Sequence, residues 1–143
     1  MLPRLGHHAL RFPGSRAGLE QAAADLRVVL DRANVHGRAR YYAELAFEEV
    51  VSNVVRYAYS DGAAHQIDVS VELSTDAIVL TFLDDGRPFD PSQQPAPKLP
   101  STIQAAPSGG LGLLLMRQRA ADMRYERTPD GKNRLTVKIA ALQ

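Results

Sequence analysis

Hydrophobic residues in this chain recur first at helical spacing and then at strand spacing. Between Ser15, a residue type that caps helices, and the break at residues 34–37, apolar residues return every three or four positions and predict a helix. A second helical run extends from about residue 39 to Tyr59, where the turn sequence Ser60-Asp61-Gly62 ends it. The short mixed segment 5–12 in front of both helices predicts an edge strand that ends at Pro13.

From residue 67 onward the hydrophobic period is two. Residues 67–73 and 78–83 are predicted strands of a hairpin with one buried face. Residues 88–107 contain six prolines and predict a long loop. A helix over roughly 112–122 and a hairpin that turns at 129–131 complete the chain. This order predicts an α+β protein over residues 1–143: a single-domain, two-layer sandwich with three helices on one face of a mostly antiparallel sheet.

The composition narrows the classes of function. A net charge of +1 gives no bulk attraction to nucleic acid or to an acidic membrane. The absence of cysteine excludes disulfides, thiolate zinc sites and cysteine nucleophiles, and the four histidines show no metal-ligand spacing. The sequence has neither a membrane-length apolar segment nor the apolar core of a signal peptide. We therefore expect a cytoplasmic protein that contacts neither nucleic acid nor membrane directly.

The sequence EEVVSNVV, residues 48–55, places polar groups in the second apolar helix. Glu49 and Asn53 are four positions apart, so they share one face beside the apolar stripe, whereas Glu48 points to the opposite flank. Both side chains could line the rim of a cavity, or they could be solvated boundary residues of the helix. Periodicity alone leaves these alternatives open.

Two further segments carry candidate chemistry. Asp84-Asp85-Gly86 follows an apolar strand, where a carboxylate can accept a hydrogen bond from an exocyclic amine; the same residues also form ordinary turns. Gly109-Gly110-Leu111-Gly112 opens a helix whose N–H groups suit a phosphate, unless the glycines are only a hinge. No Gly-Lys-Ser/Thr follows, so this is not a Walker A loop, and no parallel β-α-β unit surrounds it, so it is not a Rossmann fingerprint.

Three segments in this order resemble one superfamily. They are LAFEEVVSNVVRYAY at 45–59, LTFLDDGRPFDP at 80–91 and GGLGLLLMRQRAADM at 109–123. The chain resembles, from about residue 8 to 140, the GHKL or Bergerat-fold ATP-binding domains of gyrase, heat-shock chaperones, histidine kinases and mismatch-repair ATPases. Within that superfamily it is most similar to the stand-alone anti-sigma factor serine/threonine kinases of bacterial partner-switching systems.

The resemblance implies a role for each matching residue. Asn53 would ligate Mg²⁺ through its side-chain oxygen, and Glu49 would act as general base. Asp84 would receive the amino group of adenine, with Gly86 beside the base. An ATP lid of about residues 91–108 would close over the phosphates. The remaining matches are Gly109, Gly110, Leu111 and Gly112 beside the triphosphate, and Thr136 near the adenine.

Two departures from the superfamily pattern affect the assignment. Pro88 replaces the second glycine of D-x-G-x-G, as is familiar in the serine-kinase subgroup, and Tyr57 stands where a histidine is frequent. The resemblance implies an ATP- and Mg²⁺-dependent protein kinase that phosphorylates a small anti-anti-sigma protein of the STAS type, with a sigma factor as a further candidate partner. The alternatives are a non-catalytic ATP/ADP-dependent binding module and an interaction domain with a degenerate nucleotide pocket. Homodimerisation is implied by the resemblance alone.

Overall fold

One five-stranded sheet organises the protein in the computed structural model, which describes residues 6–59, 64–93 and 110–141. All neighbouring strands are antiparallel, in the order β1-β2-β3-β5-β4. The strands are β1 (Gly6–Pro13), β2 (Gln66–Leu73), β3 (Ala77–Asp84), β4 (Asp122–Arg127) and β5 (Asn133–Ala140). The helices are α1 (Arg16–Arg32), α2 (Gly37–Asn53) and α3 (Gly110–Arg119), with a π-helical turn η1 (Val54–Ala58) and a 3-10 turn η2 (Pro91–Gln93).

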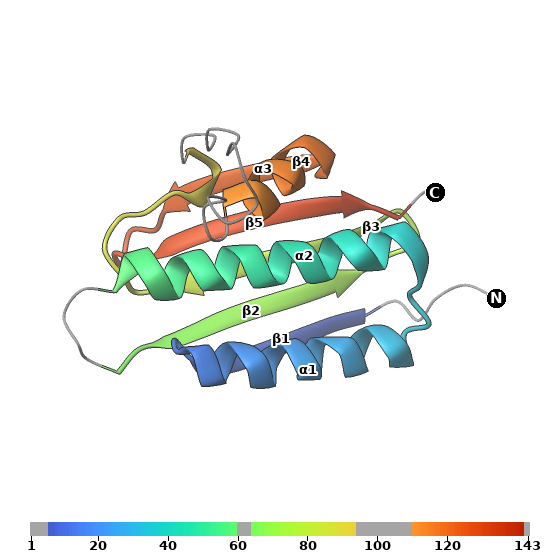
Figure 1. Ribbon diagram of the computed structural model, residues 1–143, viewed down its shortest axis with the longest axis horizontal. Coiled ribbons are helices and arrows are strands. Elements are labelled where there is room, and N and C mark those ends of the chain that lie inside the picture. The colour runs from blue at the N-terminus through green and yellow to red at the C-terminus, as the bar shows by residue number, and fades with distance from the viewer. Residues whose placement is uncertain (1–5, 60–63, 94–109, 142–143) are drawn as a thin grey trace, which may run out of the picture.

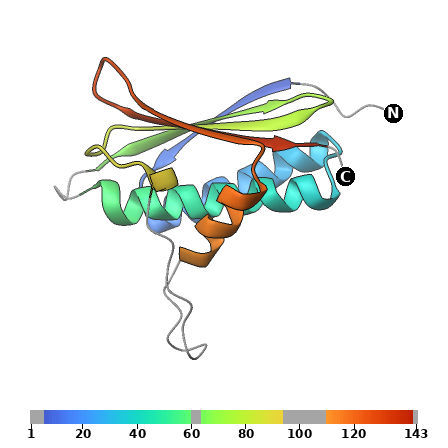
Figure 2. The same ribbon diagram turned by 90° about the horizontal axis from the view of Figure 1, so that it is seen from above.

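The three helices cover one face of the sheet (Figure 2). α2 crosses the middle strands, α1 lies along β1, and α3 packs against α2 (Figure 1). Alternate strand residues face these helices and are buried, whereas their neighbours form the open face of the sheet. The two-layer α+β architecture predicted from the sequence is thus confirmed.

Aromatic residues join the two layers at the centre of the core. The ring centroid of Phe47 on α2 lies 5.8 Å from that of Phe12 on β1 and 6.2 Å from that of Phe82 on β3. The surrounding positions are branched and apolar, with Leu26, Val50 and other core side chains fully or almost fully buried. Such burial contributes roughly 1.5–3 kcal/mol per large side chain, which fixes α2 firmly over the sheet.

Local signals predicted most element boundaries. The Ser15 hydroxyl accepts a hydrogen bond from the N–H of Gly18 at 3.1 Å, which confirms the helix cap. The helix predicted to run to residue 122 ends at Arg119, because Met123 and Tyr125 already alternate toward the core on β4. The second helix changes to a π-helical turn directly after Asn53, which the hydrophobic period did not indicate. The predicted turn at residues 60–62 lies outside the described residues, and Tyr59 is the last described residue before it.

Candidate nucleotide site

A buried carboxylate marks one end of the sheet. Asp84 is the last residue of β3 and pairs with Asn133, the first residue of β5; the two side chains are 5% and 3% exposed. Asp84 Oδ1 accepts hydrogen bonds from the Gly86 N–H and from Asn133 Nδ2, both at 2.9 Å. Among the described residues nothing donates to Oδ2, so this oxygen can accept a hydrogen bond from a ligand.

Burial governs the protonation of Asp84. Removal from water raises the pKa of its carboxyl above the ordinary value, and the hydrogen bonds from Asn133 and Gly86 lower it in part. Arg127 also favours the ionised form, since its guanidinium lies close by. The pKa of Asp84 is raised overall, so folding makes its ionisation less favourable than in the unfolded chain.

At Gly86, the backbone just after the end of β3 lies against η1, the turn that continues α2. A Cβ atom at position 86 would lie 2.5 Å from the carbonyl oxygen and 2.7 Å from the Cβ of Ala58, at the end of η1. The next residue strengthens this contact, because Arg87 donates its N–H to the Ala58 carbonyl at 2.9 Å and its Nε–H to the Tyr57 carbonyl at 2.7 Å. Only glycine fits this close backbone approach.

Asn53 and Glu49 lie on α2 just before that contact. Asn53 is 7% exposed and donates Nδ2–H to the Glu49 carbonyl at 2.6 Å. The bond orients the amide so that its oxygen, which accepts no hydrogen bond from the described residues, is left for a ligand. Glu49 is half-buried and Glu48 is exposed, as the angular placement predicted. The π-helical turn begins one residue later, and such turns are frequent at functional sites.

The glycine-rich segment is described in part. α3 begins at Gly110, so Gly110, Leu111 and Gly112 form its first turn, where backbone N–H groups have no helical acceptor. α3 contacts both α2 and η2. Gly109 and most of the predicted lid, residues 94–108, lie outside the described residues; only its start forms the η2 turn.

Asn133 is the functional residue that the sequence did not indicate. Besides its bond to Asp84, Nδ2 donates to the Arg87 carbonyl at 2.8 Å, and Oδ1 accepts from the Phe89 N–H at 3.2 Å. Oδ1 also accepts from the Tyr125 hydroxyl and, at 3.0 Å, from Arg127. One amide thus joins β3, β5, β4 and the 85–89 loop. Its only signal in the sequence was a position after a Pro-Asp-Gly turn, which any polar residue can occupy.

One implied role needs correction, and two residues make contacts that the sequence did not indicate. Arg127 is exposed at the end of β4, and its Nη1 donates to the Gly86 carbonyl at 2.9 Å. Thr136 faces the open side of the sheet, in a shallow depression with Val79 and Lys138, and so does not adjoin Asp84. The ring of His65 stacks on that of Tyr59 with 4.1 Å between centroids, and its Nδ1 lies 2.8 Å from Asp85 Oδ1.

Comparison with known proteins agrees with this geometry. The model of the histidine kinase-like ATPase domain matches residues 12–139. The chain belongs to the histidine kinase-like ATPase family. It is also 32% identical over 100 residues to the serine/threonine-protein kinase BtrW of Bordetella bronchiseptica, covering 70% of each chain.

Membership of the histidine kinase-like ATPase family confirms the resemblance inferred from the three sequence segments and implies that the domain binds ATP. The five-stranded antiparallel sheet with its three helices is consistent with the Bergerat ATP-binding fold. Within the described part of the chain, no helix has the length and apolarity needed to cross a membrane.

Proposed function

We propose that this histidine kinase-like ATPase, acting as one domain over residues 1–143, transfers the γ-phosphate of ATP to a serine or threonine of a protein. The proposed substrate is a small anti-anti-sigma protein of the STAS type, and a sigma factor is a further proposed partner. The relationship to a serine/threonine-protein kinase supports the reaction. The observation that carries the proposal is the junction at Gly86, where the end of β3 meets η1, the π-helical turn that continues the helix of Glu49 and Asn53.

The adenine end of the proposed site rests on Asp84. Its Oδ2 would accept a hydrogen bond from the exocyclic amine, while Oδ1 stays held by Gly86 and Asn133. Gly86 would let the base approach the backbone closely. The phosphates would lie toward the first turn of α3, where the N–H groups of Gly110, Leu111 and Gly112, together with Gly109, favour anionic oxygens.

The donor set near Asn53 fits Mg²⁺. The described residues contain no cluster of three His, Asp or Glu side chains that could hold a metal ion by themselves. Mg²⁺ usually takes one or two protein oxygens and completes its shell with phosphate oxygens and water, so the oriented Asn53 oxygen is sufficient. When bound, the ion would neutralise charge on the phosphates.

Glu49 is the proposed general base. Its carboxylate would accept the proton of the substrate hydroxyl as that oxygen forms a bond to the γ-phosphorus, while the bond from the γ-phosphorus to the bridging oxygen breaks and ADP leaves. Glu49 lies on the same flank of α2 as Asn53, one turn away, which is the placement this role needs.

The experiment compares two adjacent glutamates. Purified Glu49→Ala, the matched control Glu48→Ala and the unmodified protein are incubated with labelled ATP, Mg²⁺ and candidate STAS-type proteins. Glu49→Ala should bind ATP normally and lose phosphate transfer by about 10²–10⁴-fold, whereas Glu48→Ala should retain both activities. Undiminished transfer by Glu49→Ala excludes the base assignment. ATP binding without transfer by the unmodified protein would favour the non-catalytic binding module.

A further inference from the structure

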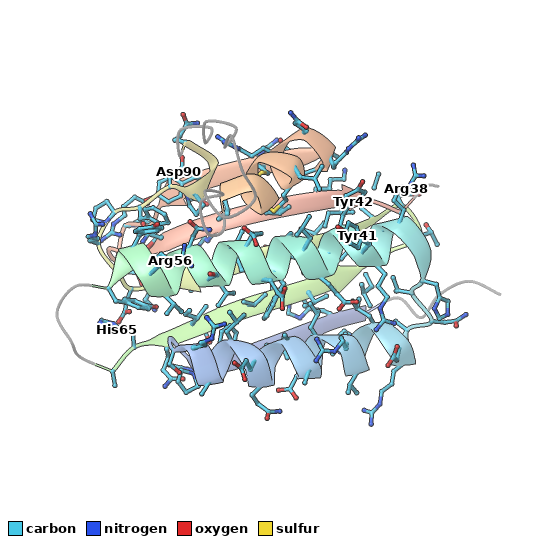
Figure 3. All side chains as sticks on the ribbon, viewed as in Figure 1. Arg38, Tyr41, Tyr42, Arg56, His65 and Asp90 are labelled. Carbon is cyan, nitrogen blue, oxygen red and sulfur yellow. The ribbon has the colours of Figure 1, made fainter. Side chains whose placement is uncertain are left out.

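A small pocket lies at the end of α2 that is remote from the nucleotide site. It has a volume of about 190 Å³ and lies between the start of α2, the end of α3 and the end of β5. Figure 3 shows Arg38, Tyr41 and Tyr42 at this end of α2, and Arg56, His65 and Asp90 at the other. We call it the arginine pocket; its lining residues are Arg38, Ala39, Tyr42, Arg119, Ile139 and Ala140.

Two positive charges in this pocket have no counter-charge among the described residues. Arg38 and Arg119 are exposed, and within the described ranges neither guanidinium makes a hydrogen bond or ion pair. No lining residue is acidic. Arg40 differs, because Asp31 and Glu44 both accept hydrogen bonds from its guanidinium and raise its pKa. The protein therefore neutralises the arginine that faces α1 and leaves the two that line the pocket available.

The first turn of α2 adds to the positive potential of the pocket, whereas the carbonyl end of α3 beside Arg119 acts against it. His36, at the N-cap of α2, makes no side-chain hydrogen bond to the helix, and the first turn contains no acidic residue. Arg38 and Ala39 belong to that turn and form one wall of the pocket. A cation at the positive end of a helix is unfavourable by about 0.3–1 kcal/mol unless an anion approaches. An anion in the pocket would meet both arginines and relieve this repulsion.

The neighbouring aromatic residues indicate what kind of anion fits. Tyr42 lines the pocket, and its ring packs edge-on against Tyr41, with 5.2 Å between centroids and 70° between planes. Tyr41 is 57% exposed. Exposed tyrosine beside arginine is the composition of protein interfaces, where both residue types contribute much of the binding energy. A small inorganic anion would leave Tyr41 in water, whereas a polypeptide segment would bury it.

We propose that the arginine pocket binds an aspartate or glutamate side chain of a partner protein, with the adjoining segment of that partner lying over Tyr41. The carboxylate is held by Arg38 and Arg119 through charge-assisted hydrogen bonds. Arg38 is 15 residues from Asn53 along the chain, or about 22 Å along the helix, so the surface is separate from the nucleotide site. The proposal does not depend on the kinase reaction and holds for a non-catalytic regulator as well.

The test is an NMR titration of the full chain labelled with ¹⁵N. The probe is the blocked peptide Gly-Glu-Leu-Glu-Asp-Gly; its matched control, Gly-Gln-Leu-Gln-Asn-Gly, has the same shape without the charges. We expect the acidic peptide to shift the Nε–H signals of Arg38 and Arg119 and the backbone signal of Tyr41. Arg38→Gln and Arg119→Gln should each weaken this binding about tenfold. Arg16→Gln, which removes an exposed arginine at the start of α1 and outside the pocket, should leave it unchanged.

Three results would overturn the proposal. The first is equal shifts from the acidic and the neutral peptide. The second is binding of inorganic phosphate at the same site with the affinity of the peptide, which would show a general anion site. The third is equal loss of binding in Arg16→Gln, which would show dependence on overall charge alone. ADP affinity, measured on the same samples, should be the same in all variants, so a failure here is distinguishable from a failure of the nucleotide site.

Discussion

Replacement of Asn133 by alanine removes the amide that holds together the residues of the proposed nucleotide site. Five hydrogen bonds are lost together: two donated by Nδ2, to Asp84 and to the Arg87 carbonyl, and three accepted by Oδ1. Because the side chain is 3% exposed, the partners left behind are poorly placed to find water. The change should therefore lower both stability and nucleotide affinity.

The magnitude follows from the type of each bond. Three partners of the Asn133 amide are neutral, at about 1 kcal/mol each, and two are charged groups, Asp84 and Arg127, at about 1.5 kcal/mol or more each. Their total of at least about 6 kcal/mol overstates the loss, because water can enter the vacated space and the bonds share one side chain. We expect a loss of about 3–5 kcal/mol in the free energy of unfolding. That loss corresponds to a fall of roughly 10–15 °C in Tm for a chain of this size.

Urea denaturation and calorimetric ATP titration measure the two effects. The neighbouring Arg134→Ala is the matched control: it breaks only a surface ion pair with Glu126, 2.8 Å long, and should cost less than about 1 kcal/mol. Asn133→Ala should also bind ATP more weakly, by about tenfold, since Asp84 loses one of the two donors that orient it. A variant within about 1 kcal/mol of the unmodified protein and with normal ATP affinity would refute this account of Asn133.

Two further changes probe the same junction. Gly86→Ala should lower the free energy of unfolding by about 2–4 kcal/mol and reduce ATP binding, because its Cβ would collide with the Ala58 backbone. Gly6→Ala is the control, since the atom nearest to its added Cβ is a His8 ring nitrogen at 3.3 Å. Equal urea midpoints for the two variants would contradict the reasoning. Asp84→Asn should stabilise the protein at neutral pH and weaken ATP binding at least about tenfold. Burial raises the folded-state pKa of Asp84, so the charged side chain destabilises the fold above that pKa and no longer does so below the ordinary value. The stability difference between the unmodified protein and Asp84→Asn should therefore vanish in acid. The ATP affinity of the unmodified protein should fall over the same pH range.

Much of the fold could be predicted because each element carries its own period. Buried and less buried residues alternate along the whole of β2 and from Ile78 onward in β3, and the buried stripe of α2 follows the helical repeat. The end of α3 was wrong by about three residues because Ala120 and Ala121 continue a helical composition, while the start of β4 is set by pairing with β5. Strand pairing is a tertiary effect, which local sequence does not contain.

The residues of the candidate site also divide into those that the sequence predicted and those that it did not. Glu49, Asn53, Asp84 and Gly86 were predicted because short contiguous segments contain them. Asn133 and Arg127 were missed because their roles depend on contacts with residues more than 40 positions away. In the sequence one is a residue after a turn and the other a surface arginine. The pairing of β3 with β5 brings Asn133 to Asp84, and the pairing of β4 with β5 brings Arg127 beside Asn133.

The chemistry at position 84 shows why a carboxylate is kept there despite its cost. An asparagine could replace Asp84 in shape, but the Gly86 N–H and Asn133 Nδ2 both donate to one oxygen and would hold the asparagine oxygen in that place. The asparagine NH₂ group would then face the ligand, where an adenine amine also donates, so two donors would meet. Only a carboxylate satisfies both internal donors and still offers an acceptor to the ligand. We therefore explain the cost of burying a carboxylate at position 84 by the hydrogen bond that it is proposed to make to a nucleotide.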